Sequence, residues 1–204
     1  MENRSHIVFG TGPLGLSVMR ALVERGAGNI RMVNRSGRLP AGLPEGVEVV
    51  KGDITDPASV RALTIGAEEV YICAQPEYTQ WPEKFPPIIE GAIAGLTGSG
   101  ARVIFGDNLY MYGPVDGPMR EDMSYAATGR KGVARAKLAN TLMEAHRAGK
   151  VRAAIGRSSD FYGPFVLDSA VGDRVFKSAL AGKAADIVGD PDAPHTYMFI
   201  SDFG

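Results

Sequence analysis

Short apolar runs rich in Val and Ile alternate along this chain with longer stretches whose apolar residues recur every three or four positions. Continuous apolar runs of this length are typical of strands that helices cover on both faces. The expected strands are Ile7–Phe9, Asn29–Val33, Val47–Val50, Glu69–Ala74, Arg102–Phe105 and Val151–Ile155. The expected helices are Pro13–Arg25, Pro57–Leu63, Pro86–Leu96 and Gly132–Ala148. The alternation predicts an α/β fold with a doubly wound parallel sheet and ligands at the carboxyl ends of its strands.

A G-x-G-x-x-G pattern begins at Gly10, between the first expected strand and the first expected helix. Gly10 permits a sharp turn, Gly12 has no Cβ to block a pyrophosphate, and Gly15 lets the helix approach its strand closely. Pro13 and Leu14 open the helix, whose first free N–H groups and positive dipole end suit a phosphate. A glycine-rich turn between any strand and helix is the alternative. The strand-turn-helix context favours a Rossmann-type dinucleotide site.

The end of the second expected strand bears on the choice of cofactor. Sites for NAD commonly carry an acidic residue there, about 20 residues after the glycine motif, to bind the adenosine ribose. This chain has Asn34, Arg35 and Ser36 at that place, with Arg38 close behind and no Asp or Glu. A guanidinium can pair with a 2′-phosphate and a hydroxyl can donate to it. The pattern predicts NADP rather than NAD, although loop arginines are often only solvated charges.

Composition limits the classes of function. The 204 residues, 45% of them hydrophobic, can bury one substantial core. The 22 basic and 23 acidic residues balance, so a nucleic-acid or membrane surface is not indicated. The single cysteine, Cys73, excludes a disulfide within the chain, and no zinc spacing occurs. Without an apolar leader or membrane-length run, we expect a cytoplasmic protein with a small-molecule substrate, and a homodimer is compatible with the sequence.

Further motifs follow the expected strands in order. They are Gly52-Asp53-Ile54-Thr55-Asp56, Ile72-Cys73-Ala74-Gln75, Tyr112-Gly113, Arg157 with Phe161-Tyr162-Gly163-Pro164, and Phe199-Ile200-Ser201-Asp202. In this order they resemble the short-chain dehydrogenase/reductase superfamily, in its extended and atypical NAD(P)-dependent epimerase/dehydratase branch. The resemblance implies that Asp53, with Ile54 beside it, contacts the adenine region. It also implies that Ala74 and Gln75 line the central riboses of the cofactor.

One family signature is missing, because no Lys has a Tyr four positions before it. Counting from Tyr112, the catalytic Lys of the family aligns with Lys137, its Tyr with Val133 and its Ser/Thr with Asn108. In the family the Tyr exchanges a proton with the substrate oxygen, and the Lys lowers the pKa of that phenol. Valine can do neither. The resemblance leaves Lys137 a contact with the nicotinamide ribose, and Asn108 a hydrogen bond to a substrate carbonyl.

Three residues in adjacent loops are candidates to replace the missing acid: Tyr110, Tyr125 and Asp107. The alternative for Tyr110 is that it is a packing aromatic at a strand end. The basic stretch from Arg130 to Lys137 has two interpretations as well. It is either a site for an anionic substrate or cofactor phosphate, or a solvated helix face.

The resemblance suggests two regions, a Rossmann domain over residues 1–165 and the beginning of a small substrate lobe over residues 166–204. The family continues beyond this point, so we expect a shortened chain or a minimal form. Two functions fit. The first is an NADP(H)-dependent oxidoreductase or epimerase/dehydratase-like enzyme with a non-standard proton donor, acting on a small carbonyl, hydroxyl or nucleotide-sugar-like substrate. The second is a non-catalytic NADP-binding redox sensor or regulator.

Overall fold

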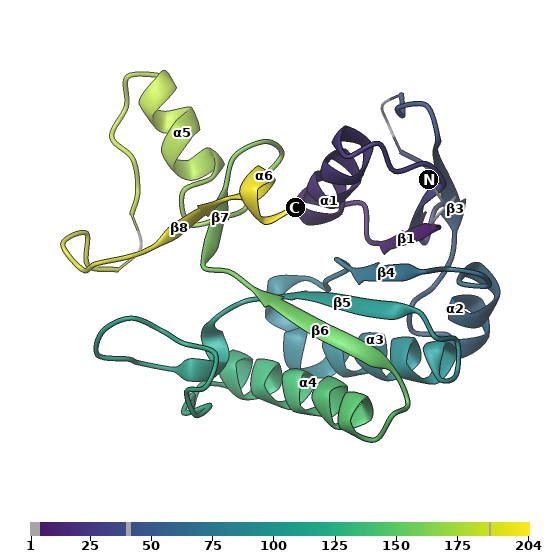
Figure 1. The fold of residues 1–204 in the computed structure, drawn as a ribbon. Helices are drawn as coiled ribbons and strands as arrows, with labels where there is room; N and C mark the ends of the chain where they lie inside the picture. Colours follow the sequence, from purple (N-terminus) through teal and green to yellow (C-terminus); the bar gives the residue numbers. More distant parts are fainter. Residues whose placement is uncertain (1–4, 40–41, 188) are drawn as a thin grey trace.

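The computed structural model describes residues 5–39, 42–187 and 189–204. Its centre is a six-stranded sheet in the order β3-β2-β1-β4-β5-β6, with every neighbouring pair parallel (Figure 1). The strands are β1 (His6–Phe9), β2 (Ile30–Asn34), β3 (Val47–Lys51), β4 (Glu69–Ile72), β5 (Arg102–Asp107) and β6 (Arg152–Arg157). The order reverses between β1 and β4, the place where doubly wound sheets bind their ligands. The α/β Rossmann-type architecture is confirmed.

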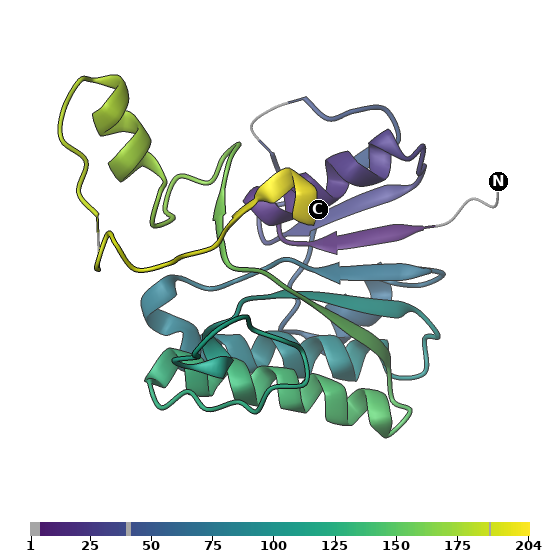
Figure 2. The same cartoon turned by 60° about the vertical axis from the view of Figure 1, so that its left-hand side comes forward.

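Helices cover both faces of the sheet, as Figures 1 and 2 show from two directions. They are α1 (Pro13–Glu24), α2 (Pro57–Leu63), α3 (Trp81–Leu96) and α4 (Arg130–Arg147). The larger apolar core lies between the sheet and α2, α3 and α4, where Val60, Phe85 and Leu138 are buried with Phe9 and Phe105. A smaller core joins α1 to the other face. Burial on both faces explains why the strands read as unbroken apolar runs.

Helix α3 begins at Trp81, five residues before the start expected at Pro86. Proline is tolerated in a first helical turn, where its missing N–H has no intrahelical partner, and Pro82 stands there. Pro86 and Pro87 lie inside the helix. Burial of Trp81 at 5% exposure and Phe85 at 1% outweighs the unfavourable proline positions.

The chain beyond β6 forms a second small layer. Strand β7 (Asp160–Tyr162) pairs in parallel with β8 (Tyr197–Phe199), and helix α5 (Asp173–Leu180) lies between them in sequence. Helix α6 (Ile200–Phe203) returns to α1, where the Ser17 hydroxyl donates to the Ile200 carbonyl at 2.8 Å. Both views show the end of the chain beside α1. The expected boundary at residue 165 falls between β7 and α5 and stays a prediction.

Within the described part of the chain, none of the helices has the length and apolar character needed to cross a membrane.

Candidate functional site

The three glycines of the G-x-G-x-x-G turn differ in the space around them. A Cβ on Gly10, which has a φ of +111°, would lie 2.6 Å from the backbone nitrogen of Ala74. A Cβ on Gly15 would overlap the carbonyl oxygen of Gly10. A Cβ on Gly12 would meet no protein atom within 4 Å. The turn therefore needs Gly10 and Gly15 for its own packing, and it leaves open space at Gly12, where a ligand can approach the backbone.

That open space lies at the start of α1. Gly12 is the N-cap residue, no side chain caps the helix, and Pro13 occupies the first turn. The first N–H groups of a helix have no intrahelical partner, and Leu14 and Gly15 carry two of these groups. Backbone donors, a positive dipole end and room for a ligand together fit a pyrophosphate.

Asn34, at the end of β2, organises the loop that follows. Its Oδ1 accepts hydrogen bonds from the backbone nitrogen of Ser36 at 3.0 Å, from the Ser36 hydroxyl at 2.9 Å and from the Gly37 nitrogen at 2.6 Å. Its Nδ2 donates to the Thr11 hydroxyl at 3.0 Å. Asn34 thus ties the second-strand loop to the glycine turn. The side chain of Arg35 is left exposed on this loop.

The loop after β3 places Asp53 near Arg35. Asp53 Oδ1 accepts from the Thr55 backbone nitrogen at 2.9 Å and from the Thr55 hydroxyl at 2.7 Å. These hydrogen bonds hold the pKa of Asp53 below its ordinary value, and the Arg35 charge adds to the effect. Ile54, next in sequence, is buried at 7% exposure. The candidate adenine-side residues therefore meet at the ends of β2 and β3.

The end of β4 lies against the glycine turn. Ala74 packs on Gly10, and Gln75 follows as an exposed side chain. Cys73 donates its backbone N–H to the Phe9 carbonyl at 2.8 Å. Burial raises the pKa of the Cys73 thiol to about 12, so this thiol is a packing group rather than a nucleophile.

A buried ion pair lies at the end of β5. Arg135 of α4 and Asp107 are 3% and 4% exposed, and Nη1 of the arginine is 2.9 Å from Oδ1 of the aspartate. The guanidinium lies 4.0 Å from the ring centroid of Trp81 and 4.2 Å from that of Phe85. Burial raises the pKa of Asp107, against the opposing effect of the Arg135 and Arg157 charges. Among the described residues, Asp107 Oδ2 and Arg135 Nε have no hydrogen-bond partner.

Tyr110 is near this ion pair and belongs to the 3₁₀ helix η2 (Tyr110–Tyr112). Asn108 holds it in place, since Asn108 Oδ1 accepts from the Tyr110 backbone nitrogen at 3.1 Å. The Tyr110 hydroxyl is 3.3 Å from that of Tyr78, which belongs to the 3₁₀ helix η1 (Tyr78–Gln80). Burial and the hydrogen bond to Tyr78 raise the pKa of Tyr110, which weakens it as a proton donor. The structure thus brings Asn108, Tyr110 and Asp107 together.

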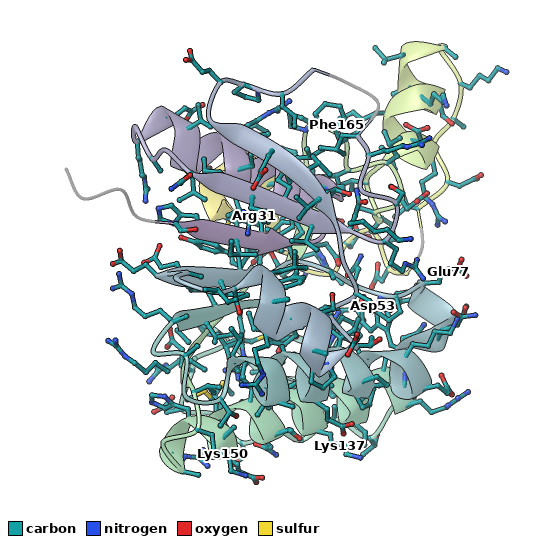
Figure 3. The ribbon with its side chains drawn as sticks, turned by 90° about the vertical axis from the view of Figure 1, so that its right-hand side faces the viewer. Arg31, Asp53, Glu77, Lys137, Lys150 and Phe165 are labelled. Carbon is teal, nitrogen blue, oxygen red and sulfur yellow. The ribbon has the colours of Figure 1, made fainter. Side chains whose placement is uncertain are left out.

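Helix α4 presents a different face to this cluster than the family resemblance implied. Lys131 and Arg135, one turn apart, lie on the inner side, with the Lys131 Nζ 3.3 Å from the Tyr78 ring centroid. Val133 is 50% exposed and Lys137 is exposed. A helix has about 3.6 residues per turn, so residues two apart point to nearly opposite sides. Figure 3 shows Lys137 at the outer edge of the molecule, away from Asp53 at the strand ends. The structure does not bring Lys137 or Val133 to the cluster.

Tyr125 belongs to a separate clamp around Arg157, the last residue of β6. Arg157 donates to the Tyr112 hydroxyl at 2.8 Å and, through its other terminal nitrogen, to the Tyr125 hydroxyl. The guanidinium lies 5.5 Å and 5.2 Å from the two ring centroids. The clamp holds the loop before α4 onto the sheet. Tyr125, one of the three candidate acids, is therefore engaged by Arg157 and lies in a different cluster from Asp107 and Tyr110.

In the sequence, Lys131 and Arg135 are two members of a basic stretch, and their place on the inner side of α4 was not predicted. The sequence does contain a signal for that side of the helix. Ala134, Leu138 and Leu142 recur at helical spacing and are all buried, which identifies the inner side of α4.

The fold and the glycine turn define a Rossmann-type dinucleotide-binding protein. The chain belongs to the NAD dependent epimerase/dehydratase family, whose model matches residues 7–204. The members of this family are enzymes.

Solved structures share the fold at low sequence identity. The UDP-N-acetylglucosamine 4-epimerase of Methanobrevibacter ruminantium, in complex with UDP-N-acetylmuramic acid, superposes with a TM-score of 0.84 at 17% identity, over 99% of this chain and 71% of its own. The UDP-glucuronic acid 4-epimerase of Bacillus cereus, in complex with UDP-glucuronic acid and NAD, gives 0.82 at 20% identity, over 97% and 70%. The enzyme WbmH of Bordetella bronchiseptica, in complex with NAD+, gives 0.75 at 17% identity, over 98% and 68%.

Proposed function

We propose that this chain binds NADP(H) at its glycine turn and acts as an NADP(H)-dependent oxidoreductase or epimerase/dehydratase-like enzyme. The substrate is a small molecule that carries a hydroxyl or carbonyl group, of the nucleotide-sugar class. The observation that carries the proposal is the glycine turn, in which two positions exclude a Cβ by packing and Gly12 faces open space at a helix N-terminus. Family membership supports the nicotinamide cofactor.

The residues present fit such a cofactor along the carboxyl edge of the sheet. The start of α1 would hold the pyrophosphate, Asp53 and Ile54 would flank the adenine, and Ala74 and Gln75 would line the central part. The nicotinamide half would then extend toward the ends of β4 and β5, where Asn108 lies. The bound cofactor supplies or accepts a hydride. The protein supplies orientation and a group that exchanges a proton with the substrate oxygen.

Arg35 supports NADP over NAD. It is exposed at the end of β2, and Asn34 holds its loop in place without contributing a carboxylate. Arg35 also lies near Asp53, whose negative charge it offsets next to an incoming phosphate. The Bacillus cereus epimerase structure contains NAD, so the choice of NADP rests on these residues of the present chain.

The structural neighbours support the nucleotide-sugar class, because two of them hold UDP-linked sugars. Turnover of such a sugar distinguishes the enzyme from the second candidate, a non-catalytic NADP-binding sensor. The sensor is favoured by one observation: Val133 and Lys137, which align with the Tyr and Lys of the family, are exposed on the outer side of α4.

A fluorescence titration tests the cofactor assignment. NADPH should bind at least several-fold more tightly than NADH, because an arginine–phosphate hydrogen bond contributes about 1.5–3 kcal/mol, or roughly ten-fold and more. Arg35→Ala should remove the preference. Arg25→Ala, an exposed arginine at the other end of α1, is the matched control and should bind both cofactors as the wild type does. Equal affinities in the wild type would contradict the assignment to NADP.

A further inference from the structure

The amine of Lys131 lies over the ring of Tyr78, whose hydroxyl contacts that of Tyr110 in the candidate site. Lys131 stands in the first turn of α4, is partly buried, and its Nζ lies 3.3 Å from the centroid of the Tyr78 ring. A cation placed over an aromatic ring is attracted to it, and this contact restrains the long side chain. Its neighbour Arg130 pairs with Glu83 at 2.9 Å, whereas Lys131 has no carboxylate partner among the described residues. The Lys131 amine is therefore restrained in position and free to meet a ligand.

The backbone beneath Lys131 is fixed against the end of β5. A Cβ on Gly132 would lie 2.6 Å from the Tyr110 carbonyl oxygen, so α4 and η2 meet without room for a side chain. One turn further on, Arg135 is locked between Asp107 and the rings of Trp81 and Phe85. These contacts fix the first turns of α4, from which Lys131 projects, against the segment that carries Tyr110.

The other titratable groups of the cluster are less suited to exchange a proton with a substrate. Asp107 is buried under Arg135, and Tyr110 has its pKa raised by burial and by Tyr78, with the Asp160 charge adding to the shift. His195, on the segment before β8, is already paired with Asp160 at 3.0 Å. Lys131 is partly exposed, carries an ionisable proton and is restrained by its contact with Tyr78.

We propose that Lys131 is the group that exchanges a proton with the substrate oxygen, and that Arg135, held by Asp107, is a positioning residue. The inference rests on the proposed function. In the reducing direction a hydride from NADPH forms a C–H bond at the substrate carbonyl carbon, and the electron pair of the broken C=O π bond takes a proton from Lys131 Nζ. The neutral amine regains a proton from solvent. In the oxidising direction the neutral amine accepts the hydroxyl proton as hydride leaves for NADP+.

Chemical labelling tests the position of the amine without any need for turnover. The protein is treated briefly with acetic anhydride, with and without NADPH, and the acetylation of each lysine is followed by peptide mass spectrometry. At NADPH concentrations ten times its Kd, acetylation of Lys131 should slow about ten-fold if the bound cofactor covers the amine. Lys137, on the opposite side of the same helix, is the matched control and should label at an unchanged rate.

Kinetics with UDP-glucose, UDP-glucuronic acid and UDP-N-acetylglucosamine test the chemistry. Lys131→Met should keep the NADPH Kd and lose about 10²–10⁴-fold in kcat, the usual contribution of general acid–base catalysis. Lys137→Met should keep both values. If NADPH binds but does not slow the acetylation of Lys131, the inference about Lys131 is wrong and the proposed function is unaffected. The same holds if Lys131→Met keeps the kcat of the wild type. A wild type that binds NADPH and turns over none of these sugars overturns it in favour of the sensor. A protein that binds neither NADPH nor NADH overturns the proposed function as well.

Discussion

Arg135 and Asp107 form an ion pair inside the protein, 2.9 Å apart, at the point where α4 meets the end of β5. Both residues are almost completely buried, and the contact joins a helix to the strand whose end carries Asn108. Two charges taken out of water cost free energy that their attraction recovers only in part. We infer that a pair of this kind fixes the position of α4 relative to β5 as much as it stabilises the fold.

Removing one partner of this pair should cost far more than removing both. Asp107→Leu leaves a buried guanidinium unpaired and should lower the free energy of unfolding by about 3–5 kcal/mol. Asp107→Leu with Arg135→Met should recover most of that loss. Urea unfolding followed by Trp81 fluorescence measures both variants. Glu83→Ala, which breaks the exposed pair with Arg130, is the control and should change stability by less than about 1 kcal/mol. A double variant as unstable as the single one would contradict this account.

Gly12 and Gly15 should respond to substitution in different ways. Gly12→Val should abolish NADPH binding and leave the fold intact, because its side chain would enter open space where the pyrophosphate belongs. Gly15→Val should destabilise the protein itself, because its Cβ would overlap the Gly10 carbonyl. Circular dichroism and NADPH titration separate the two effects. Normal NADPH binding by a folded Gly12→Val variant would show that the turn is not the phosphate site.

Val133→Tyr should have no catalytic effect. Restoring a Tyr four residues before Lys137 recreates the family pattern in sequence, but the new phenol would lie on the exposed side of α4. We expect kcat and the NADPH Kd to stay within about two-fold of the wild type, as is usual for surface substitutions that touch nothing. Steady-state kinetics check this. A gain in turnover would place Val133 and Lys137 at the nicotinamide, and the face of α4 described above would then not be the catalytic one.

The Cys73 thiol should be nearly inert in the folded protein. Burial raises its pKa to about 12, so at pH 8 almost all of it is the unreactive thiol form. Reaction with a disulfide reagent at pH 8 should be roughly a thousand-fold slower than that of a free cysteine, whose pKa is about 8.5. The thiolate fraction, and with it the rate, should keep rising as the pH is increased toward 12. Urea should restore the ordinary rate, and a fast reaction in the native state would show that the thiol is solvated.

The strands and the glycine turn could be predicted from sequence because their causes are local. Apolar runs covered on both faces are visible as runs, and a turn that excludes a Cβ requires glycine at Gly10 and Gly15. The start of α3 was expected at Pro86 because proline favours the first turn of a helix. The helix begins earlier, at Trp81, because Trp81 and Phe85 are buried, and this burial is visible only in the folded chain. Strands β7 and β8 have three residues each and carry too little periodicity to stand out.

The candidate site also has a part that could be predicted and a part that could not. The glycine turn could be predicted from the types and order of its residues. The burial of Arg135 did not follow, because the apolar spacing of Ala134, Leu138 and Leu142 marks the inner side of α4 but does not predict a charged residue on it. Arg135 looks in sequence like one more solvated charge, and its partner Asp107 lies 28 positions away along the chain. Long-range pairing of this kind leaves no trace in local spacing.

The hydrogen bonds of Asn34 have a consequence for how well this chain tolerates substitution at residue 35. Because Asn34 fastens its own loop and also grips Thr11, the shape of the loop does not depend on the identity of residue 35. The side chain of residue 35 can therefore be replaced without a change in the conformation of the loop. Under the proposed function, a substitution of Arg35 alone should change the preferred dinucleotide without altering the glycine turn.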